Sequence, residues 1–505
     1  MFIRSEEVPV QTLKSLRIRL SVVLILLCAA FAIAAPAQTF TALADLDGAN
    51  GSSPLRNALV QGTDGNFYGT AFSGGAFGKG SVYKVTKDGT ISLVYSFCAL
   101  AHCADGAEPS SPLVVGADGN FYGTTQGGGS GTEPAGTFFK LTPGGTLTTL
   151  HNFCSLPYCP DGGGPTGALV LAFDGNFYGV ASQFGNSSGS GTIFKITPAG
   201  TLTTLYNFCS KTDCTDGSRP LAGLVQARDG SFYGTTEGGT TGNGTVFRFT
   251  PTGQFKNLYT FCTVSGCPDG NNPYGPLVVT ASGNIYGTAA GGGQGADGSG
   301  GTVFEMTSAG TFSVVYRFCS ATNCDDGSGP QSGLILGSDG QLYGSTDEGG
   351  FNGKGTAFRI TSAGASVRLH SFYSTDGAYP MSALVQSTDG SLYGDTSNGG
   401  PTDRTNCSNA GPPFGCGTVF HLSLDLKPFV KTAQPSGAVG DSIIILGNGL
   451  TGSTTVAFNG TAAAFSVVSD TEITASVPTG ATTGTIQVAT PTTILTSNTA
   501  FHVLP

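Results

Sequence analysis

Tryptophan is absent from this 505-residue chain, and Asp, Glu, Lys and Arg together make up only 11% of it. Without tryptophan, the chain has neither the Asp boxes of sialidases nor the motifs of propeller quinoproteins. The formal net charge of −10 excludes a basic surface for nucleic acid and gives no attraction to anionic lipids. Hydrophobic residues are not scarce: they make up 39% of the chain, with 33 Phe and 16 Tyr, so a core can form and disorder is excluded.

Long apolar runs are also rare, and the chain has one, at its N-terminus. It spans residues 20–35 and follows three basic residues between positions 14 and 19. The run is short for a membrane span, and Ala35-Pro36-Ala37 offers a small-x-small cleavage site. We therefore predict a signal peptide over residues 1–37, with an uncleaved N-terminal anchor as the alternative. Cleavage removes four of the 22 basic and two of the 32 acidic residues, which leaves a net charge of −12.

Cleavage also removes Cys28 and leaves 12 of the 13 cysteines, an even number. Five pairs share a Cys-x4-Cys spacing, which in an exported chain predicts disulfides. Zinc is the alternative, but it needs close Cys-x-x-Cys hooks or added histidines, and no histidine recurs with these pairs. Each six-residue loop limits the gain to about 2 kcal/mol per bridge. The predicted disulfides are Cys98–Cys103, Cys154–Cys159, Cys209–Cys214, Cys262–Cys267, Cys319–Cys324 and Cys407–Cys416.

A short tripeptide, an aromatic or aliphatic residue followed by Tyr-Gly, recurs seven times at intervals of 50 to 57 residues. Asp-Gly precedes each copy except the fifth, which has Ser282-Gly283. Asp-Gly between apolar runs predicts a β-hairpin with a type I′ turn, in which positive φ is required. Each repeat carries four such runs and no helical periodicity, which predicts four antiparallel strands. The copies begin at Phe67, Phe121, Phe177, Phe232, Ile285, Leu342 and Leu392.

The two ends of the repeat region are complementary. Residues 39–48 match a fourth strand with its trailing Asp-Gly, but they precede the first copy. The last copy stops after its third strand, at residues 418–422. We therefore predict an all-β fold with a seven-bladed β-propeller of four-stranded blades over residues 38–426, whose last blade is completed by the N-terminal strand. A β-solenoid is the alternative.

The long Gly-rich loops and the cysteine-containing links between blades share one face of such a propeller, and we assign any ligand to that face. An aspartate follows every fourth strand on this face. One hypothesis is a ring of carboxylates that binds Ca²⁺, a cationic ligand or a sugar. The other is seven turn aspartates that accept local backbone hydrogen bonds. Similarly, the Phe-Tyr pairs are expected to pack between blades rather than to form a sugar platform. The aspartates are Asp47, Asp105, Asp161, Asp216, Asp269, Asp326 and Asp376.

The repeat, for example GSFYGTT at 230–236 and GTVFR at 244–248, resembles the GloVer tandem repeat of exported bacterial proteins. This resemblance implies a secreted or cell-surface protein of the kind that carries varied C-terminal sorting anchors. The chain departs from that pattern because it ends in Phe501-His502-Val503-Leu504-Pro505, without a basic tail or apolar anchor. Permanent surface attachment is therefore not expected.

After Lys427-Pro428 the sequence changes to short alternating strands with Gly and Asn turns. This pattern predicts a small β-sandwich over residues 427–505. The order of its motifs, at 440–450, 456–460, 470–478 and 484–488, resembles an IPT/TIG domain. That resemblance implies an immunoglobulin-like module used for spacing, adhesion or carbohydrate contact.

No polar cluster departs from the repeat register, and the histidines of the mature chain fall at unrelated positions in it. We therefore predict an exported binding or adhesion protein without catalysis, located in the periplasm, on the cell surface or in the medium. The alternative is a polysaccharide-acting propeller enzyme with an appended binding module. Apart from Ca²⁺ no cofactor is expected, and the partner is a glycan or a surface protein, not nucleic acid. The protein is expected to be a monomer without a membrane span after signal cleavage.

Overall fold

A computed structural model describes residues 38–131, 133–293, 300–361, 363–400, 407 and 415–505. The predicted signal peptide lies outside these residues. The described chain is built from β-strands, with three short 3₁₀ turns that end at the second cysteine of a Cys-x4-Cys loop, namely Ala101–Cys103, Thr212–Cys214 and Thr322–Cys324. No helix among these residues is long and apolar enough to cross a membrane.

Six blades are four-stranded antiparallel meanders in chain order. Blade 1 consists of β2 (Val60–Gln61), β3 (Phe67–Ala71), β4 (Ser81–Val85) and β5 (Ile91–Ser96), and blade 2 of β6 (Val114–Val115), β7 (Phe121–Thr125), β8 (Thr137–Leu141) and β9 (Leu147–Asn152). Blade 3 consists of β10 (Val170–Leu171), β11 (Phe177–Ala181), β12 (Thr192–Ile196) and β13 (Leu202–Asn207), and blade 4 of β14 (Val225–Gln226), β15 (Phe232–Thr236), β16 (Thr245–Phe249) and β17 (Phe255–Thr260). Blade 5 consists of β18 (Val278–Val279), β19 (Ile285–Ala289), β20 (Thr302–Met306) and β21 (Phe312–Arg317), and blade 6 of β22 (Ile335–Leu336), β23 (Leu342–Thr346), β24 (Thr356–Ile360) and β25 (Ser366–Ser371).

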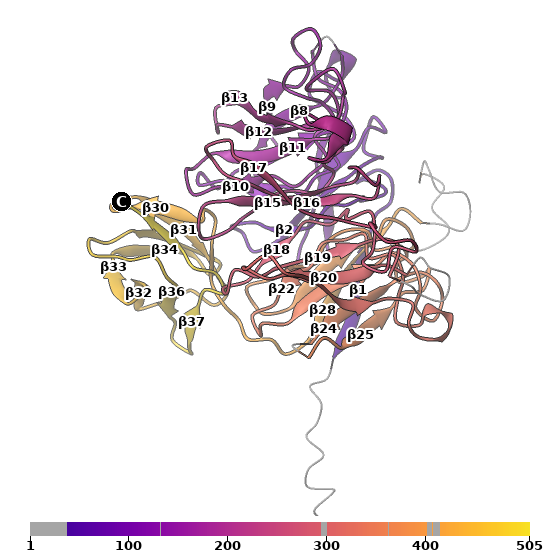
Figure 1. The fold of residues 1–505 in the computed structure, drawn as a ribbon. Coiled ribbons are helices and arrows are strands. Elements are labelled where there is room, and N and C mark those ends of the chain that lie inside the picture. The colour runs from indigo at the N-terminus through magenta and orange to yellow at the C-terminus, as the bar shows by residue number, and fades with distance from the viewer. Residues whose placement is uncertain (1–37, 132, 294–299, 362, 401–406, 408–414) are drawn as a thin grey trace, which may run out of the picture.

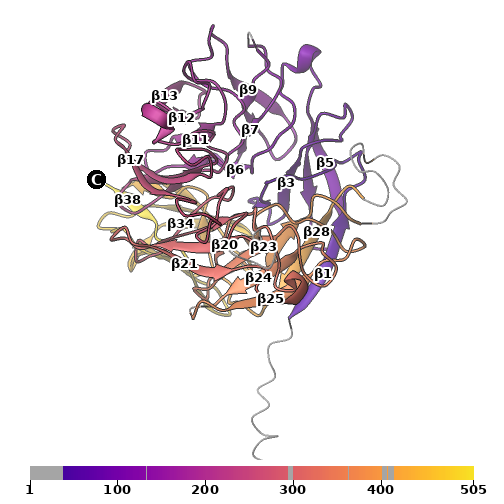
Figure 2. The same ribbon diagram turned by 45° about the vertical axis from the view of Figure 1, so that its right-hand side comes forward.

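Blade 7 joins the two ends of the ring, as predicted. It contains β26 (Val385–Gln386), β27 (Leu392–Asp395) and β28 (Thr418–Ser423), and its outer strand is β1 (Thr39–Asp45) from the N-terminus. β1 pairs antiparallel with β28, with Thr39 opposite Ser423 and Asp45 opposite Thr418. Figure 2 shows the indigo β1 beside the orange β28. The seven-bladed propeller closed by its first strand is therefore confirmed.

The Asp-Gly turns differ from the predicted type I′ geometry. In the first turn only Gly65 has a positive φ, at 77°, whereas type I′ requires it at both central residues. The N–H of Gly65 donates to the carbonyl of Gly62, and the N–H of Gly62 donates to the carbonyl of Asn66. This is a type I turn followed by a glycine in the left-handed region. Asp64 stays right-handed while its carboxylate accepts the N–H of Asn66 at 3.1 Å.

The aromatic residues of the repeat pack between blades, as expected. Tyr68 of blade 1 contacts Phe121 of blade 2 with ring centroids 4.3 Å apart, and Tyr178 of blade 3 contacts Phe232 of blade 4 at 4.3 Å. Phe67 closes the ring against Tyr393 of blade 7 at 3.9 Å. These contacts bury large apolar surfaces at the blade interfaces, where most of the propeller core lies.

The C-terminal strands form the predicted immunoglobulin-like sandwich. One sheet has the order β29 (Lys431–Thr432), β31 (Ser442–Leu446), β35 (Glu472–Ser476), β34 (Phe465–Ser469), and the other β33 (Thr461–Ala463), β32 (Thr455–Phe458), β36 (Ile486–Ala489), β37 (Ile494–Thr496). β30 (Ser436–Ala438) pairs parallel with β38 (His502–Leu504). Alternating side chains such as Ile443, Ile445 and Ile473 fill the space between the sheets.

The sandwich packs on one side of the propeller, beside its inner strands (Figure 1). It contacts the Asp-Gly turns: Thr471 Oγ1 donates to the carbonyl of Thr63 at 2.7 Å, and His502 stacks on Phe173 at 4.6 Å. The Asp-Gly turns lie at the end of each first strand, so this is the short-turn face. The Gly-rich loops and cysteine links lie on the opposite, long-loop face.

Candidate functional site in the central channel

The first strands of the blades surround a central channel that contains a cavity of about 250 Å³. A second cavity of about 490 Å³ shares Val114 and Leu169 with it and is also lined by sandwich residues such as Thr432 and Asn498. The two cavities therefore follow one another along the channel, and the sandwich covers its short-turn end. The 250 Å³ cavity lies toward the long-loop end, to which we assigned the ligand.

One position of the repeat supplies most of the polar groups in this cavity. It stands three residues before a buried leucine of the first strand, as in Arg56 before Leu59 and Tyr274 before Leu277. Although the repeat is regular elsewhere, this position differs from blade to blade. In chain order it holds Arg56, Ser110, Thr166, Leu221, Tyr274, Gln331 and Met381, all of which except Ser110 line the cavity.

Arg56 owes its place to one extra residue in blade 1. In the other six blades a proline precedes the buried leucine by four residues, as in Pro109 and Leu113, whereas Pro54 precedes Leu59 by five. Arg56 adopts a φ of 55°, in the left-handed region that non-glycine residues seldom occupy. Backbone strain of this kind concentrates at functional sites.

The Arg56 side chain crosses the channel to blades that are not adjacent to its own. Its guanidinium lies 4.5 Å from the centroid of the Tyr274 ring of blade 5. Its Nη2 lies 3.5 Å from Oε1 of Gln331 of blade 6, the outer limit of a hydrogen bond. Among the described residues no carboxylate forms an ion pair with Arg56. Burial lowers the pKa of Arg56, while Tyr274 and Glu237 oppose that shift.

Two carboxylates lie around this arginine at the ends of second strands. Glu237 follows β15, accepts the hydroxyl of Tyr274 at 3.2 Å and pairs with Arg219 at 3.0 Å. Asp347 follows β23 and accepts a hydrogen bond from Gln331 through Oδ2. Asp347 is only 8% exposed, its Oδ1 has no hydrogen-bond partner, and burial raises its pKa to about 7.

This polar cluster stays in the repeat register, as expected, but the seven blades do not share it. Arg56, Tyr274 and Gln331 occupy one repeat position in three blades, and Glu237 and Asp347 occupy a second. Their identities, rather than their positions, break the repeat. A comparison of the seven copies position by position would have found these residues. At the two positions concerned, the residue is polar in some blades and apolar in others, whereas most other positions keep one residue type.

The predicted aspartates lie on the long-loop face, and six of them are engaged in their own loops. Asp105 is fully buried and accepts the hydroxyl of Tyr95 at 2.8 Å and the N–H of Ala99 at 2.9 Å. Five more aspartates likewise accept one hydrogen bond from a side chain of the fourth strand and one from a backbone N–H. They are Asp161, Asp216, Asp269, Asp326 and Asp376. Asp47 instead accepts the N–H of Asn50 at 2.9 Å. No group of three or more His, Cys, Asp or Glu in the described chain is arranged to hold a metal ion.

Two histidines have repeat positions after all. His151 and His370 occupy the place of Tyr95 on the fourth strand, and each lies close to the aspartate of its own loop, at 3.0 and 3.1 Å. The expectation that the histidines fall at unrelated positions is wrong for this pair, because a tyrosine hydroxyl and an imidazole N–H fill the same place. All six predicted disulfides are present. Five close the links that precede Asp105, Asp161, Asp216, Asp269 and Asp326, and Cys407–Cys416 lies between β27 and β28.

The aspartates of the Asp-Gly turns have a role that the sequence pattern alone does not reveal. Asp64 accepts the hydroxyl of Tyr68 at 3.0 Å and pairs with Lys84 at 2.7 Å. Asp118 and Asp174 have the same two partners in their own blades. Tyr68 and Lys84 face each other across β3 and β4. These aspartates therefore fix the hairpins of the short-turn face.

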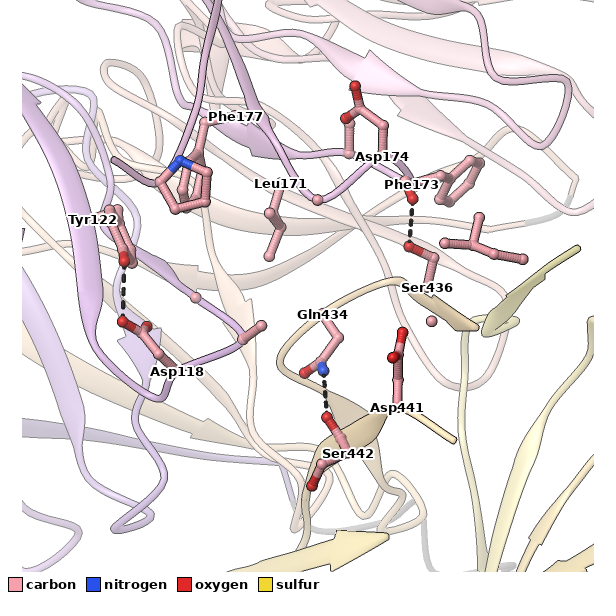
Figure 3. Close-up of a pocket in the computed structure, with 17 residues that line it drawn as sticks. Asp118, Tyr122, Leu171, Phe173, Asp174, Phe177, Gln434, Ser436, Asp441 and Ser442 are labelled. Carbon is pink, nitrogen blue, oxygen red and sulfur yellow. Dashed lines mark hydrogen bonds between the residues drawn. The ribbon is translucent and has the colours of Figure 1, made fainter. Parts of the chain in front are cut away.

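A cleft of about 450 Å³ separates the turns of blades 2 and 3 from the sandwich (Figure 3). Its polar groups are largely used within the protein: Ser436 Oγ donates to the carbonyl of Phe173 at 2.8 Å, and Gln434 Nε2 donates to the carbonyl of Ser442 at 3.1 Å. Asp118 and Asp174 carry the ion pairs described above. The cleft is therefore part of the domain junction.

Comparison with known families agrees with this architecture. The Gloeobacter/Verrucomicrobia repeat matches residues 28–236, 130–323 and 226–462, which together span most of the chain. The chain belongs to this repeat family. The IPT/TIG domain matches residues 428–503, in the sandwich. Both resemblances seen in the sequence are thus confirmed.

Solved structures with similar folds are distant in sequence. One, of a Bacteroides thetaiotaomicron protein of unknown function, is 13% identical, covers 77% of this chain and 76% of its own, and has a TM-score of 0.41. A gluconolactonase from Xanthomonas campestris is 14% identical over 62% of this chain and 88% of its own, with a TM-score of 0.36. A luciferin-regenerating enzyme is 13% identical over 58% and 86%, with a TM-score of 0.37. No curated protein matches the chain.

Proposed function

We propose that this chain is an exported binding protein that takes its ligand at the long-loop end of the central channel. One observation carries the proposal: side chains from blades 1, 4, 5 and 6 converge there at positions where the repeat is otherwise free to vary. Binding sites lie where a rigid scaffold presents variable side chains. The six disulfides and the acidic composition support a location outside the cytoplasm.

The sandwich acts in this proposal as a spacer and base. It covers the short-turn end of the channel and leaves the long-loop face to solvent and ligand. A glycan or a surface protein is the expected partner class for the face as a whole. The proposal includes a location at the cell surface and a carbohydrate as the ligand.

The test is a glycan array probed with residues 38–505, with hydrolysis assays on every polymer that binds. The matched variants are Tyr274→Ala, at the long-loop end of the channel, and Asp174→Asn, on the short-turn face. We expect Tyr274→Ala to abolish binding and Asp174→Asn to retain it. Equal loss in both variants would place the ligand elsewhere and refute the proposal.

A second candidate function is hydrolysis of a polysaccharide. The observation in its favour is Asp347, whose pKa of about 7 suits a general acid at neutral pH. Release of sugars by the wild type, lost in Asp347→Asn, would establish the enzyme and overturn the first candidate.

A further inference from the structure

The central cavity contains a cation whose hydrogen-bonding groups are not satisfied by the protein. The guanidinium of Arg56 has five N–H donors, and among the described residues its polar contact is the 3.5 Å approach to Gln331. The central carbon of the guanidinium lies 4.5 Å from the centroid of the Tyr274 ring, a cation–π contact rather than a hydrogen bond. Arg56 is partly exposed, so its remaining donors face the channel, where the fork of an arginine matches a carboxylate or a phosphate.

The nearby charges do not supply this anion. Glu237 pairs with Arg219 at 3.0 Å, and Asp347 accepts from Gln331 and has a pKa of about 7, so at neutral pH part of it is uncharged. Burial remains the largest influence on the pKa of Arg56 and lowers it. An anionic ligand would reverse that destabilisation of the charged guanidinium.

Most of the rest of the cavity wall is apolar. The hydroxyls of Thr166 and Ser332 also line it, but they donate to the backbone carbonyls of Leu221 and Ser345. Leu113, Leu169, Leu221, Ala222, Pro276 and Met381 line it, and its volume is about 250 Å³. A cavity of this kind accepts a compact apolar body, and a glycan or surface protein of the proposed function would lie on the long-loop face outside it. A dianion such as phosphate would bring a second charge, and Arg56 is the one cation among the described residues that line the cavity.

We propose that the central cavity binds a small monocarboxylate, whose apolar body lies among these leucines and whose carboxylate forms a bidentate pair with Arg56. This inference rests on the proposed binding function and names the ligand class of the channel. The extra residue before Leu59 and the φ of 55° at Arg56 hold the guanidinium across the channel for this purpose. Planar carboxylates match the fork of the guanidinium.

The probe is benzoate, titrated into residues 38–505 by calorimetry, with benzamide as the neutral isostere and glucuronate as a carboxylate with a polar body. We expect saturable binding of benzoate, none of benzamide, and weaker binding of glucuronate. Arg56→Gln is expected to weaken benzoate binding at least about tenfold, the loss of one charge-assisted pair. Arg317→Gln, at an exposed residue of the outer strand β21, is the matched control and should leave binding unchanged.

Met381→Phe provides an independent variant, because it fills the cavity and keeps Arg56. This variant is also expected to lose benzoate binding, and its melting temperature shows whether the fold is intact. No heat of benzoate binding up to about 10 mM, equal binding by Arg56→Gln and the wild type, or tighter binding of glucuronate would each overturn the inference. If such a result occurs while the glycan array still shows Tyr274-dependent binding, the ligand class fails and the proposed function stands.

Discussion

Tyr83 donates its phenolic hydrogen to the carboxylate of Asp395, with Oη and Oδ2 2.9 Å apart, across the junction of blade 1 and blade 7. Both side chains are buried, with exposures of 0% and 1%. The place of Tyr83 is held by phenylalanine in the other blades, and that of Asp395 by Thr, Ser or Val. The two exceptions to the repeat therefore meet at the one junction where the ends of the ring join.

Tyr83→Phe should destabilise the protein because it removes the hydroxyl that donates to the buried carboxylate of Asp395. We expect the free energy of unfolding to fall by about 1–3 kcal/mol. The double variant Tyr83→Phe with Asp395→Thr restores the pair found at other blade junctions and should recover most of that loss. Denaturant unfolding of the four proteins of this double-mutant cycle measures the coupling. A double variant as unstable as Tyr83→Phe would contradict the role of the pair.

The same carboxylate makes stability depend on pH. Burial raises the pKa of Asp395 from 3.8 to about 7, although Tyr83 opposes the shift. A folded-state pKa above the unfolded one means that the stabilising contribution is fully present below pH 3.8 and is lost as the pH rises through about 7. The melting temperature of the wild type relative to Asp395→Thr should therefore fall between pH 4 and pH 8. A difference that stays constant over this range would show that Asp395 is ionised throughout.

Most of the fold could be predicted from the sequence because the pattern of each strand recurs in seven repeats. The displaced strand at residues 39–45 identified the closed ring, and the paired cysteines identified the disulfides. The Asp-Gly turn type was not readable, because Asp64 uses its side chain to accept the N–H of Asn66 and so avoids positive φ.

The candidate site was much less readable. Arg56 and Gln331 are 275 residues apart and Tyr83 and Asp395 are 312 apart, and only ring closure brings them together. A search for what the copies share discards these residues, since each of them is a departure from the repeat. The predicted aspartates illustrate the converse: Asp105 and its counterparts recur because every loop needs the same internal acceptor.

Blade 5 carries a reversed version of the Asp–Tyr–Lys arrangement. Ser282 replaces the turn aspartate, and Glu305 replaces the lysine and accepts the hydroxyl of Tyr286 at 2.6 Å. We expect Glu305→Lys to lower the free energy of unfolding by about 1 kcal/mol, because Tyr286 loses its acceptor. Adding Ser282→Asp should restore the arrangement of blades 1 to 3 and recover the loss. Chemical denaturation compares the two variants; additive losses would show that the residues act independently.

Asp216 and Asp213 lie in the same cysteine loop and provide a matched pair. Asp216 is fully buried and accepts from Tyr206 at 2.7 Å and from the N–H of Ser210 at 3.0 Å, whereas Asp213 is exposed. We expect Asp216→Ala to cost about 2 kcal/mol of unfolding free energy and Asp213→Asn to cost little. Asn suits the φ of 55° at Asp213.

The same two variants separate the hypotheses for the aspartate ring. If the carboxylates serve their own loops, adding Ca²⁺ after chelation leaves the melting temperature of the wild type unchanged. A rise in the wild type that is reduced in Asp216→Ala would instead support a ring that binds the cation.

Lys87 joins three parts of the molecule. Its Nζ lies 2.8 Å from Asp389 of blade 7 and 3.2 Å from Asn448 of the sandwich, while the residue itself belongs to the turn between β4 and β5 of blade 1. Lys84, which pairs with Asp64 in its own blade, is the matched control. Each ion pair is partly exposed, so we expect a loss of no more than about 1 kcal/mol in global stability from either Lys87→Ala or Lys84→Ala.

The two lysine variants should differ in how firmly the sandwich is held. Without Lys87 the sandwich loses a contact next to the connecting segment, where the N–H of buried Phe429 donates to the carbonyl of Thr388. Local opening there exposes Phe429 and Lys431 to proteases without unfolding either domain. We therefore expect limited proteolysis to cleave between the propeller and the sandwich several-fold faster in Lys87→Ala than in the wild type or Lys84→Ala. Equal cleavage rates in all three proteins would show that Thr63–Thr471 and Phe173–His502 hold the sandwich without help from Lys87.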